Sequence, residues 1–241
     1  MGLKQRESAM GYFLFDAFVL LMEGGIHVVS ILPGVWLVYR SVSAGFLLAS
    51  AAIVAAWFVS ALSFVFVIVG AKRLIGRIRP GRFVLTGKRA IPWILVDRLV
   101  KITQRSPYRN LIIDNAFYRY LYFRGMGADI KPTLLLGQRV VIPEPYFLRV
   151  GHHVLIGDEA VLSAHKVEHN VVTLEPIEIG DNVLIGARAL IMPGVKIGSN
   201  ATIAAGAVLP RGTVVPEGET WAGHPASKIS LFAPKAGKNG A

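Results

Sequence analysis

Two long apolar segments lie in the first third of the chain. The second of them, residues 45–70, holds 26 residues without a charged side chain. A helix needs roughly 20 mostly apolar residues to cross the hydrocarbon core of a bilayer. This segment therefore predicts a spanning helix with length to spare for tilt.

The first apolar segment, residues 12–39, allows two interpretations. Its interruptions are Asp16, Glu23, Gly24, Gly25, His27 and Pro33. One interpretation is a single kinked span that ends near Arg40, and the other is an interfacial helix to about Met22 followed by a short second segment. We favour the kinked span. Glu23 and His27 lie one helical turn apart, and both an ion pair inside the membrane and a structural contact between helices remain open for them.

Two shorter segments mix bulky apolar residues with cations. Residues 90–105 place apolar side chains at helical spacing around Arg98, and residues 110–125 combine an aromatic cluster with Arg119 and Arg124. Helices of this composition lie in the plane of the membrane interface, with their cations near anionic headgroups. Both segments are therefore predicted as interfacial helices.

The C-terminal half of the chain follows a period of six residues. Eight large apolar positions are six apart: Ile179, Ile185, Ile191, Ile197, Ile203, Leu209, Val215 and Trp221. A small or β-branched residue stands four positions after each of the first six: Val183, Ala189, Val195, Ala201, Ala207 and Thr213. Upstream, Ile130, Leu136 and Ile142 hold one phase, and Val150, Ile156 and Leu162 hold another, with a two-residue slip between them.

A period of six is neither that of an α-helix nor that of an alternating strand, and it is typical of a parallel β-helix. Each hexad supplies a short strand and a tight turn, and three hexads, about 18 residues, close one triangular coil. Each coil buries its apolar face only by stacking on its neighbours. The repeat predicts between four and five coils.

The charge of the chain is local. The chain has a net charge of +11. Residues 71–131 carry all of this excess, with fourteen Lys and Arg against three Asp, because the remainder of the chain carries twelve residues of each sign. Cations directly after an apolar segment favour an anionic membrane face over a nucleic acid. Because positive residues stay cytoplasmic, we expect a multi-pass protein of the inner (cytoplasmic) membrane, with both termini and the β-helix on the cytoplasmic side. The chain has no cysteine, which excludes disulfides, Cys-ligated zinc and a thiol nucleophile.

Residues 130–226 resemble the hexapeptide-repeat acyltransferases, whose domain is a left-handed parallel β-helix. The closing segment, residues 221–229, is similar to the terminal Gly-Asn-Pro-Ala-Lys pattern of that family, with His224 in place of Asn and Ser227 before the lysine. More loosely, residues 71–176 with the apolar hairpin resemble the membrane-embedded terminal domains of poly-lysine-type peptide synthetases.

An interruption of the repeat carries the candidate catalytic residues. The next phased residue after Leu162 is Ile179, seventeen positions on, and the segment between them holds His165, Glu168 and His169. Imidazole titrates near neutral pH and so suits a general base, although a solvated loop histidine is the alternative. The resemblance implies that His165 is the base, with His169 as the fallback base or a substrate contact. For Glu168 and Glu175, orientation of the imidazole and a plain surface charge both remain open.

The resemblance also implies an acyl donor and an assembly. Acyl-CoA, or an acyl-carrier pantetheine, would lie along the outside of the prism between two subunits of a homotrimer, and no metal is expected. The expected donor-binding residues are Ala187, Arg188, Ala205, Arg211, Trp221, His224 and Lys228. Among them, Arg211 and Lys228 are the better candidates for the phosphates, and Ala187 and Ala205 for the pantetheine track.

The sequence as a whole predicts a membrane helical hairpin plus an all-β left-handed parallel β-helix. The expected divisions are a hairpin at 1–71, a basic interfacial segment at 72–129, the β-helix at 130–230 and a tail at 231–241. The function expected from this combination is acyl transfer, with acetyl as the expected group, from CoA to a hydroxyl or amine of a membrane-associated acceptor. A zinc carbonic anhydrase of the same fold and a non-catalytic trimeric membrane scaffold are the alternatives.

Overall fold

The structure is a computed structural model that describes residues 3–229, so the tail expected at 231–241 lies outside the described residues. The chain divides into two compact units. The first contains residues 1–78 and 91–126, and the second contains residues 79–90 and 127–241. The segment expected at 72–129 is thus shared between the units, because residues 81–84 form a strand that pairs within the second unit.

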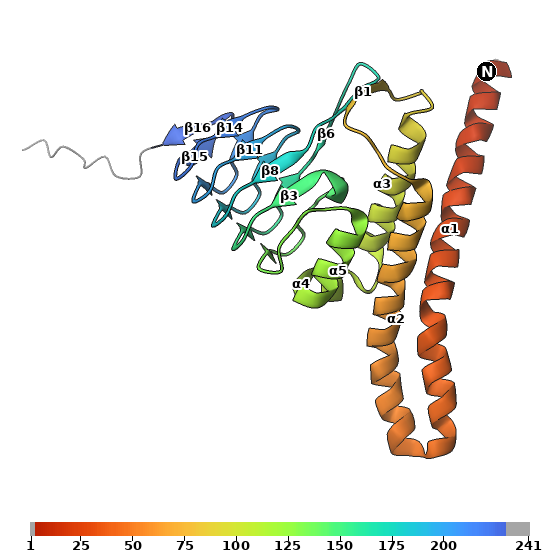
Figure 1. The fold of residues 1–241 in the computed structure, drawn as a ribbon. Helices are drawn as coiled ribbons and strands as arrows, with labels where there is room; N and C mark the ends of the chain where they lie inside the picture. The colour runs from red at the N-terminus through yellow and green to blue at the C-terminus, as the bar shows by residue number, and fades with distance from the viewer. Residues whose placement is uncertain (1–2, 230–241) are drawn as a thin grey trace, which may run out of the picture. The chain divides into compact units, whose positions relative to one another are not determined.

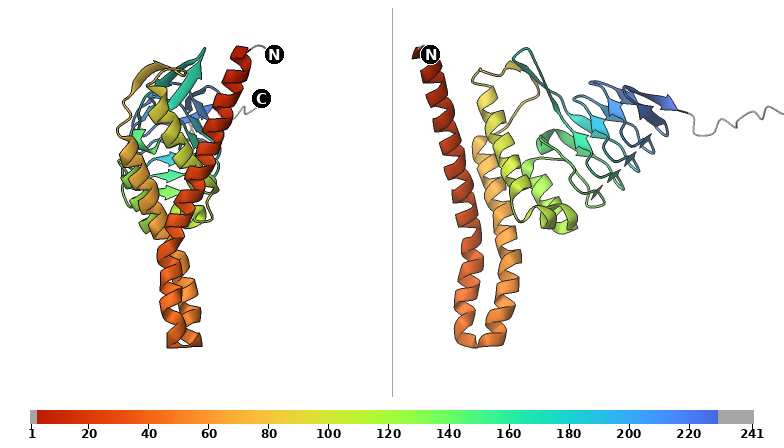
Figure 2. Two further views of the ribbon diagram at one scale, coloured as in Figure 1. Left: turned by 90° about the vertical axis from the view of Figure 1, so that its right-hand side faces the viewer. Right: turned by 180° about the vertical axis from the view of Figure 1, so that it is seen from behind.

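The first unit is helical. Its elements are α1 (Leu3–Ser41), the 3₁₀ turn η1 (Val42–Ala44), α2 (Phe46–Ile75), α3 (Ala90–Arg105), α4 (Arg109–Asp114) and α5 (Ala116–Met126). Helices α1 and α2 run side by side as an antiparallel hairpin (Figures 1 and 2). Gly45 joins them with a φ of 102°, a left-handed backbone conformation that glycine adopts at little cost.

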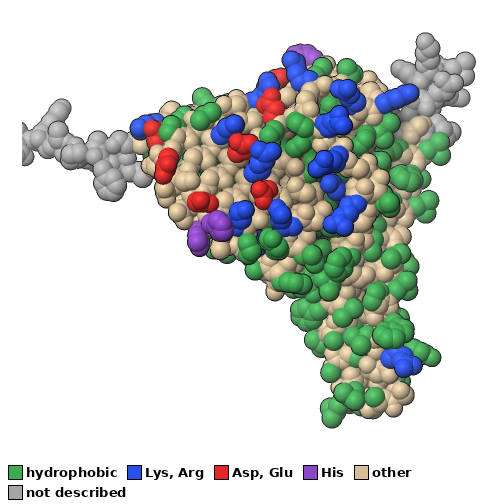
Figure 3. Space-filling view, in the orientation of Figure 1, with side chains coloured by type: hydrophobic (Ala, Val, Ile, Leu, Met, Phe, Trp, Pro, Cys, Tyr) green, Lys and Arg blue, Asp and Glu red, His purple; other side chains and the backbone are tan. Residues whose placement is uncertain are grey.

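Helix α1 is continuous through all of the interruptions in its sequence, so the alternative of a break near Met22 is wrong. His27 Nδ1 lies 2.9 Å from the main-chain carbonyl oxygen of Glu23, so the contact between these two residues is a hydrogen bond from side chain to backbone. The segments 13–44 and 46–75 are both long and apolar enough to cross a membrane. On the face shown in Figure 3, hydrophobic side chains cover the lower part of the hairpin and charged ones are few.

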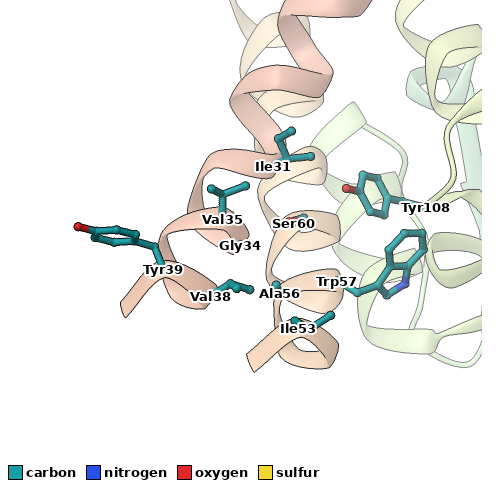
Figure 4. Close-up of a pocket in the computed structure, with 10 residues that line it drawn as sticks. All are labelled: Ile31, Gly34, Val35, Val38, Tyr39, Ile53, Ala56, Trp57, Ser60 and Tyr108. Carbon is teal, nitrogen blue, oxygen red and sulfur yellow. The ribbon is translucent and has the colours of Figure 1, made fainter. Parts of the chain in front are cut away.

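A close approach of the two long helices depends on Gly34. A Cβ at this position would lie 2.3 Å from Ser60 Oγ and 2.8 Å from the carbonyl oxygen of Ala56. Beside this crossing, the two helices and Tyr108 enclose a mainly apolar groove of about 450 Å³ (Figure 4). Tyr108 packs against Trp57 with ring centroids 5.0 Å apart.

The helix expected at 110–125 is two helices, because Asn115 interrupts it. The Asn115 side chain accepts hydrogen bonds from the backbone N–H groups of Phe117 (3.0 Å) and Tyr118 (3.3 Å), which caps α5. Arg119, which is 4% exposed, donates to the carbonyl oxygen of Ile113 at the end of α4 over 2.6 Å. Burial lowers the pKa of Arg119 from its ordinary value.

The second unit is built of short strands. They are β1 (Gly81–Val84), β2 (Leu135–Leu136), β3 (Leu148–Val150), β4 (Leu155–Ile156), β5 (Val161–Leu162), β6 (His165–Glu168), β7 (Val171–Leu174), β8 (Ile177–Ile179), β9 (Leu184–Ile185), β10 (Leu190–Ile191), β11 (Lys196–Ile197), β12 (Thr202–Ile203), β13 (Val208–Leu209), β14 (Val214–Val215), β15 (Thr220–Gly223) and β16 (Ala226–Ile229). A 3₁₀ turn, η2 (Pro145–Phe147), precedes β3.

These strands form the predicted β-helix, with one parallel sheet on each side of the prism. The sheets run β2-β4-β9-β12-β15, β5-β10-β13 and β3-β8-β11-β14, and Figure 1 shows their coils stacked. Strand partners in the later coils keep the spacing of three hexads, as in the pair of Leu184 with Thr202. The hexad residues from Ile179 to Val215 are at most 5% exposed, whereas Trp221 at the end of the series is half-buried.

Positive-φ residues make the turns between hexads. Asn182, Asn200 and the glycines at 194, 206, 212 and 218 all have φ between 55° and 73°. His153 has a φ of 54° and is likewise a turn residue. Asn and Gly tolerate this conformation better than other residues, which explains their spacing in the sequence.

Two coils are longer than three hexads, and both extra lengths fall at the same corner of the prism. The pair of Leu135 with Leu155 exceeds the regular spacing slightly, and the pair of Leu155 with Leu184 exceeds it by much more. The first excess is the two-residue slip of the sequence, at residues 143–147, and the second is the interruption at residues 163–176. We name this column of turns the insertion corner; it also contains residues 193–194 and 211–212 of the following coils.

Candidate active site

The interruption after Leu162 is a β-hairpin. Strand β6 pairs with β7 in antiparallel register, and His169 and Asn170 connect them with φ values of 45° and 66°. Strand β1 pairs with the other edge of β7, which gives the three-stranded sheet β1-β7-β6. Paired strands hold the segment that the sequence identifies only as an interruption of the repeat.

Within the insertion corner, Glu144 lies one coil away from the start of this hairpin. Val141 and Val161 form a parallel bridge just before the corner, and the Ala164 N–H donates to Glu144 Oε2 over 3.1 Å. The two-residue slip therefore places a carboxylate beside the residue that precedes His165.

Glu144 and His165 are in direct contact. His165 Nδ1 lies 2.7 Å from Glu144 Oε1, and the two side chains are 28% and 1% exposed respectively. Ser163 Oγ lies 3.2 Å from the same ring nitrogen and donates to the His165 carbonyl oxygen over 3.0 Å. A carboxylate with so little exposure must be paired or hydrogen-bonded, and both of the Glu144 oxygens are.

This contact determines what the imidazole can do. A carboxylate oxygen only accepts, so it favours a proton on Nδ1 and leaves the lone pair of the ring on Nε2. An imidazole oriented in this way by a carboxylate is arranged to take a proton from a hydroxyl or an amine, and the carboxylate stabilises the imidazolium that forms.

The other predicted catalytic residues lie elsewhere on the hairpin. Strand β6 separates His169 from His165 by four residues, about 13 Å of extended chain. Glu168 is paired with Lys166 at 2.6 Å, and side chains alternate along a strand, so Glu168 projects from the face opposite to His165. Glu175 is paired with Arg211. The carboxylate in contact with His165 is thus that of Glu144 rather than those predicted, and the phase slip is the signal for it in the sequence.

Three of the predicted donor-binding residues lie together. Ala187, Arg188 and Ala205 line a groove of about 480 Å³ at another corner of the prism, with Arg139, Asp158, Glu159 and Gly206. Arg188 Nε donates to Glu159 Oε2 over 2.8 Å, and this bond is the main cause that lowers the pKa of the Glu159 carboxyl. Small side chains leave room there for a narrow chain such as pantetheine, and two guanidinium groups lie beside it.

The remaining predicted donor-binding residues lie outside that groove. Arg211 belongs to the insertion corner, where it binds Glu175. Trp221 Nε1 and Lys228 Nζ bind the two oxygens of Glu219 at 2.9 and 2.7 Å. His224 connects β15 to β16. Among the side chains that the structure describes (residues 11 and 13–229), no three of His, Asp or Glu converge to hold a metal ion, so the zinc alternative has no ligand set there.

Comparison with known proteins supports the assignment of the C-terminal half as a hexapeptide repeat. Residues 176–211 match the family model described as bacterial transferase hexapeptide (six repeats). Over 167 residues the chain is 32% identical to the delta-poly-L-ornithine synthetase of Acinetobacter baumannii, covering 69% of this chain and 12% of that protein. Over 89 residues it is 35% identical to the galactoside O-acetyltransferase of Escherichia coli, covering 34% of this chain and 44% of that enzyme. The chain spans less than half of either curated relative.

A solved structure of a Vibrio cholerae hexapeptide-repeat acetyltransferase in complex with acetyl-CoA covers 61% of this chain and 91% of its own, at 20% identity and a TM-score of 0.41. The family model and the coordinates together confirm that the C-terminal half is a hexapeptide-repeat β-helix. The curated matches confirm the resemblance to hexapeptide-repeat acyltransferases and the weaker one to peptide synthetases of the poly-amino-acid kind.

Proposed function

We propose that this protein is a membrane-anchored, CoA-dependent acyltransferase that uses His165 as general base. The observation that carries the proposal is the 2.7 Å contact between His165 Nδ1 and the buried carboxylate of Glu144. It supports a mechanism in which Nε2 removes the proton from a hydroxyl or amine as that group attacks the thioester carbonyl. The carbonyl carbon gains the acceptor and loses the CoA thiolate, which leaves with the proton held by His165.

The class of the acyl donor follows from the relatives and from the groove beside Ala187 and Ala205. The galactoside enzyme of E. coli is named as an acetyltransferase. In this chain, small side chains line a groove of about 480 Å³ and Arg139 and Arg188 border it, which suits a pantetheine arm and a phosphate. Acetyl-CoA is therefore the donor that we propose, and a homotrimer is the assembly in which a groove of one subunit would serve His165 of another.

The hairpin of α1 and α2 supports membrane anchoring. Both helices are long and apolar enough to span, and residues 72–89, the last turn of α2 and the segment after it, contain seven Lys and Arg and no acid. Cations at one end of a span keep that end cytoplasmic. We place the β-helix on the cytoplasmic side, in the compartment that holds acetyl-CoA, and the acceptor at the membrane surface.

The proposal is tested by measuring thiol release from acetyl-CoA by the full chain in detergent, with a panel of acceptors. The panel contains a galactoside, L-ornithine, a poly-L-ornithine peptide and an amino-phospholipid, so that it includes both hydroxyls and amines. Because the chain has no cysteine, a thiol reagent detects only released CoA. His165→Ala should lower the rate about a hundred- to ten-thousand-fold.

His169→Ala is the matched control, because it removes an imidazole from the turn of the same hairpin, at the end of β6 opposite to His165. It should retain the rate of the unaltered protein. Equal rates for His165→Ala and the unaltered protein would remove the assigned base. Intact trimers that neither bind CoA in calorimetry nor release thiol would favour a non-catalytic scaffold.

A further inference from the structure

The hairpin that carries His165 leaves and rejoins the prism at Ala164 and Glu175. The Ala164 N–H donates to Glu144 Oε2 over 3.1 Å, and the Glu175 N–H donates to the carbonyl oxygen of Ala164 over 3.0 Å. The peptide groups on both sides of Ala164 are therefore held, one by a side chain of the preceding coil and one by the returning strand. His165 comes next in the chain, so its position depends on both contacts.

The side chain of Glu175 reaches across the insertion corner to Arg211. Arg211 Nε donates to Glu175 Oε2 over 2.8 Å, and Arg211 also donates from a terminal nitrogen to Oε1, so the pair is bidentate. This geometry fixes the direction of the carboxylate as well as its distance. Hydrogen bonding from Arg211 is the largest cause that lowers the pKa of Glu175, and the charge of Arg82 in β1 lowers it further.

Gly194 lies between the two partners and makes room for their contact. Its φ is +73°, and a Cβ on it would lie 2.7 Å from Glu175 Oε2. The turn that contains Gly194 thus has no side chain at the position where the carboxylate passes. Two residues that are 36 positions apart in the chain are joined here across stacked turns.

We propose that Glu175 and Arg211 form a positioning pair that holds the base of the β6–β7 hairpin, and with it His165, against Glu144. The inference rests on the proposed function, because it assigns the pair to the geometry of the proposed base. The pair acts through the backbone of Ala164, to which the Glu175 N–H is bonded. It also replaces the expected role of Arg211 as a ligand of the CoA phosphates.

An exposed ion pair contributes little to the stability of a protein, whereas a small displacement of a general base lowers the rate of reaction strongly. The side chains of Glu175 and Arg211 are 30% and 45% exposed. Removal of the pair should therefore change kcat more than thermal stability. An Arg211 that binds the CoA phosphates would instead change the KM for acetyl-CoA and leave kcat near that of the unaltered protein.

The test compares Glu175→Gln, Arg211→Gln and the exchanged pair Glu175→Arg with Arg211→Glu in the full chain in detergent, with acetyl-CoA and the best acceptor of the panel. Each single substitution should lower kcat about ten- to a hundred-fold with little change in the KM for acetyl-CoA. The exchanged pair restores opposite charges across the same gap and should recover much of the lost kcat. Arg149→Gln is the control, because it breaks an exposed ion pair of 2.7 Å with Glu178 on a different side of the prism.

Single variants with unchanged kcat, or an exchanged pair that folds with the melting temperature of the unaltered protein and recovers nothing, would overturn the inference. An increased KM for acetyl-CoA at unchanged kcat would overturn it as well and assign Arg211 to the donor. Measurement of His165→Ala in parallel distinguishes failure of the proposed function from failure of the positioning pair. If His165→Ala is fully active, the proposed function falls and the positioning pair with it; if His165→Ala is inactive and Glu175→Gln is fully active, only the positioning pair falls.

Discussion

Replacement of Glu144 by glutamine changes one oxygen into an NH₂ group at nearly constant volume, and the partners of the two oxygens determine its effect on catalysis. These partners are the backbone N–H of Ala164 at 3.1 Å and His165 Nδ1 at 2.7 Å. A backbone N–H only donates, so the amide oxygen of the new glutamine must face Ala164. Its NH₂ group then faces Nδ1 and requires that nitrogen to accept.

The proton of the imidazole consequently moves to Nε2, the atom that should take the proton of the acceptor. The reverse orientation would set NH₂ against the N–H of Ala164 at a site that is 1% exposed, and two donors in contact there cost about 1–3 kcal/mol. The first orientation therefore prevails. We expect kcat to fall about a hundred- to a thousand-fold, which corresponds to about 2.7–4.1 kcal/mol of transition-state stabilisation.

The assay is steady-state thiol release from acetyl-CoA by the full chain in detergent, with the KM for acetyl-CoA measured in the same series. That KM should change little, because Glu144 lies outside the groove that holds Ala187 and Ala205. Glu178→Gln is the control for the same chemical change at a carboxylate that is 33% exposed and paired with Arg149. A Glu144→Gln variant that keeps kcat within about three-fold of the unaltered protein and melts normally would refute the tautomer argument.

Three further predictions concern the scaffold. Gly34→Leu should lower the melting temperature of the hairpin unit, because the new Cβ would lie 2.3 Å from Ser60 Oγ. Gly24→Leu on the same helix has open space around its Cβ and should have a smaller effect. Equal effects of the two substitutions would contradict the close crossing of the helices. Ile203→Ala removes a fully buried side chain of the prism and should cost about 2–5 kcal/mol in the free energy of unfolding, measured by denaturant titration; a cost like that of a surface substitution would contradict its inward position. Arg211→Gln should melt slightly below the unaltered protein at neutral pH. The difference should close as the pH falls below about 4.5, because Arg211 lowers the pKa of Glu175 and the pair stabilises the fold only while Glu175 is ionised; a constant difference down to about pH 3 would contradict the ion pair.

The repeat can be predicted from the sequence because each hexad contains both the apolar residue that points into the prism and the residues that form its turn. The aliphatic positions from Ile179 to Val215 and the turn residues Asn182 and Asn200 follow a rule that depends only on neighbouring coils. The candidate base can be predicted in the same way, because the interruption of the repeat that contains His165 is apparent from the sequence alone.

The partner of His165 cannot be found by the same reasoning, because it is 21 positions away and reaches the imidazole only after the coil closes. Proximity in sequence favours Glu168 and Glu175 over Glu144 for that reason. Strand β1 is a similar case, since residues 81–84 pair with a hairpin strand 87 to 93 positions further on. Both contacts depend on how the chain closes in space, and a pattern along the chain does not contain that information.

The most direct test of catalysis by His165 is a cryo-EM structure of the full chain in detergent with a non-hydrolysable acetyl-CoA analogue. The analogue carbon that stands in the place of the thioester carbonyl carbon should lie in front of His165 Nε2, with space for one acceptor atom within about 3 Å of that nitrogen and the Nδ1 contact to Glu144 retained. An analogue bound with that carbon remote from His165 in every subunit of the assembly would contradict the assignment of His165 as the base.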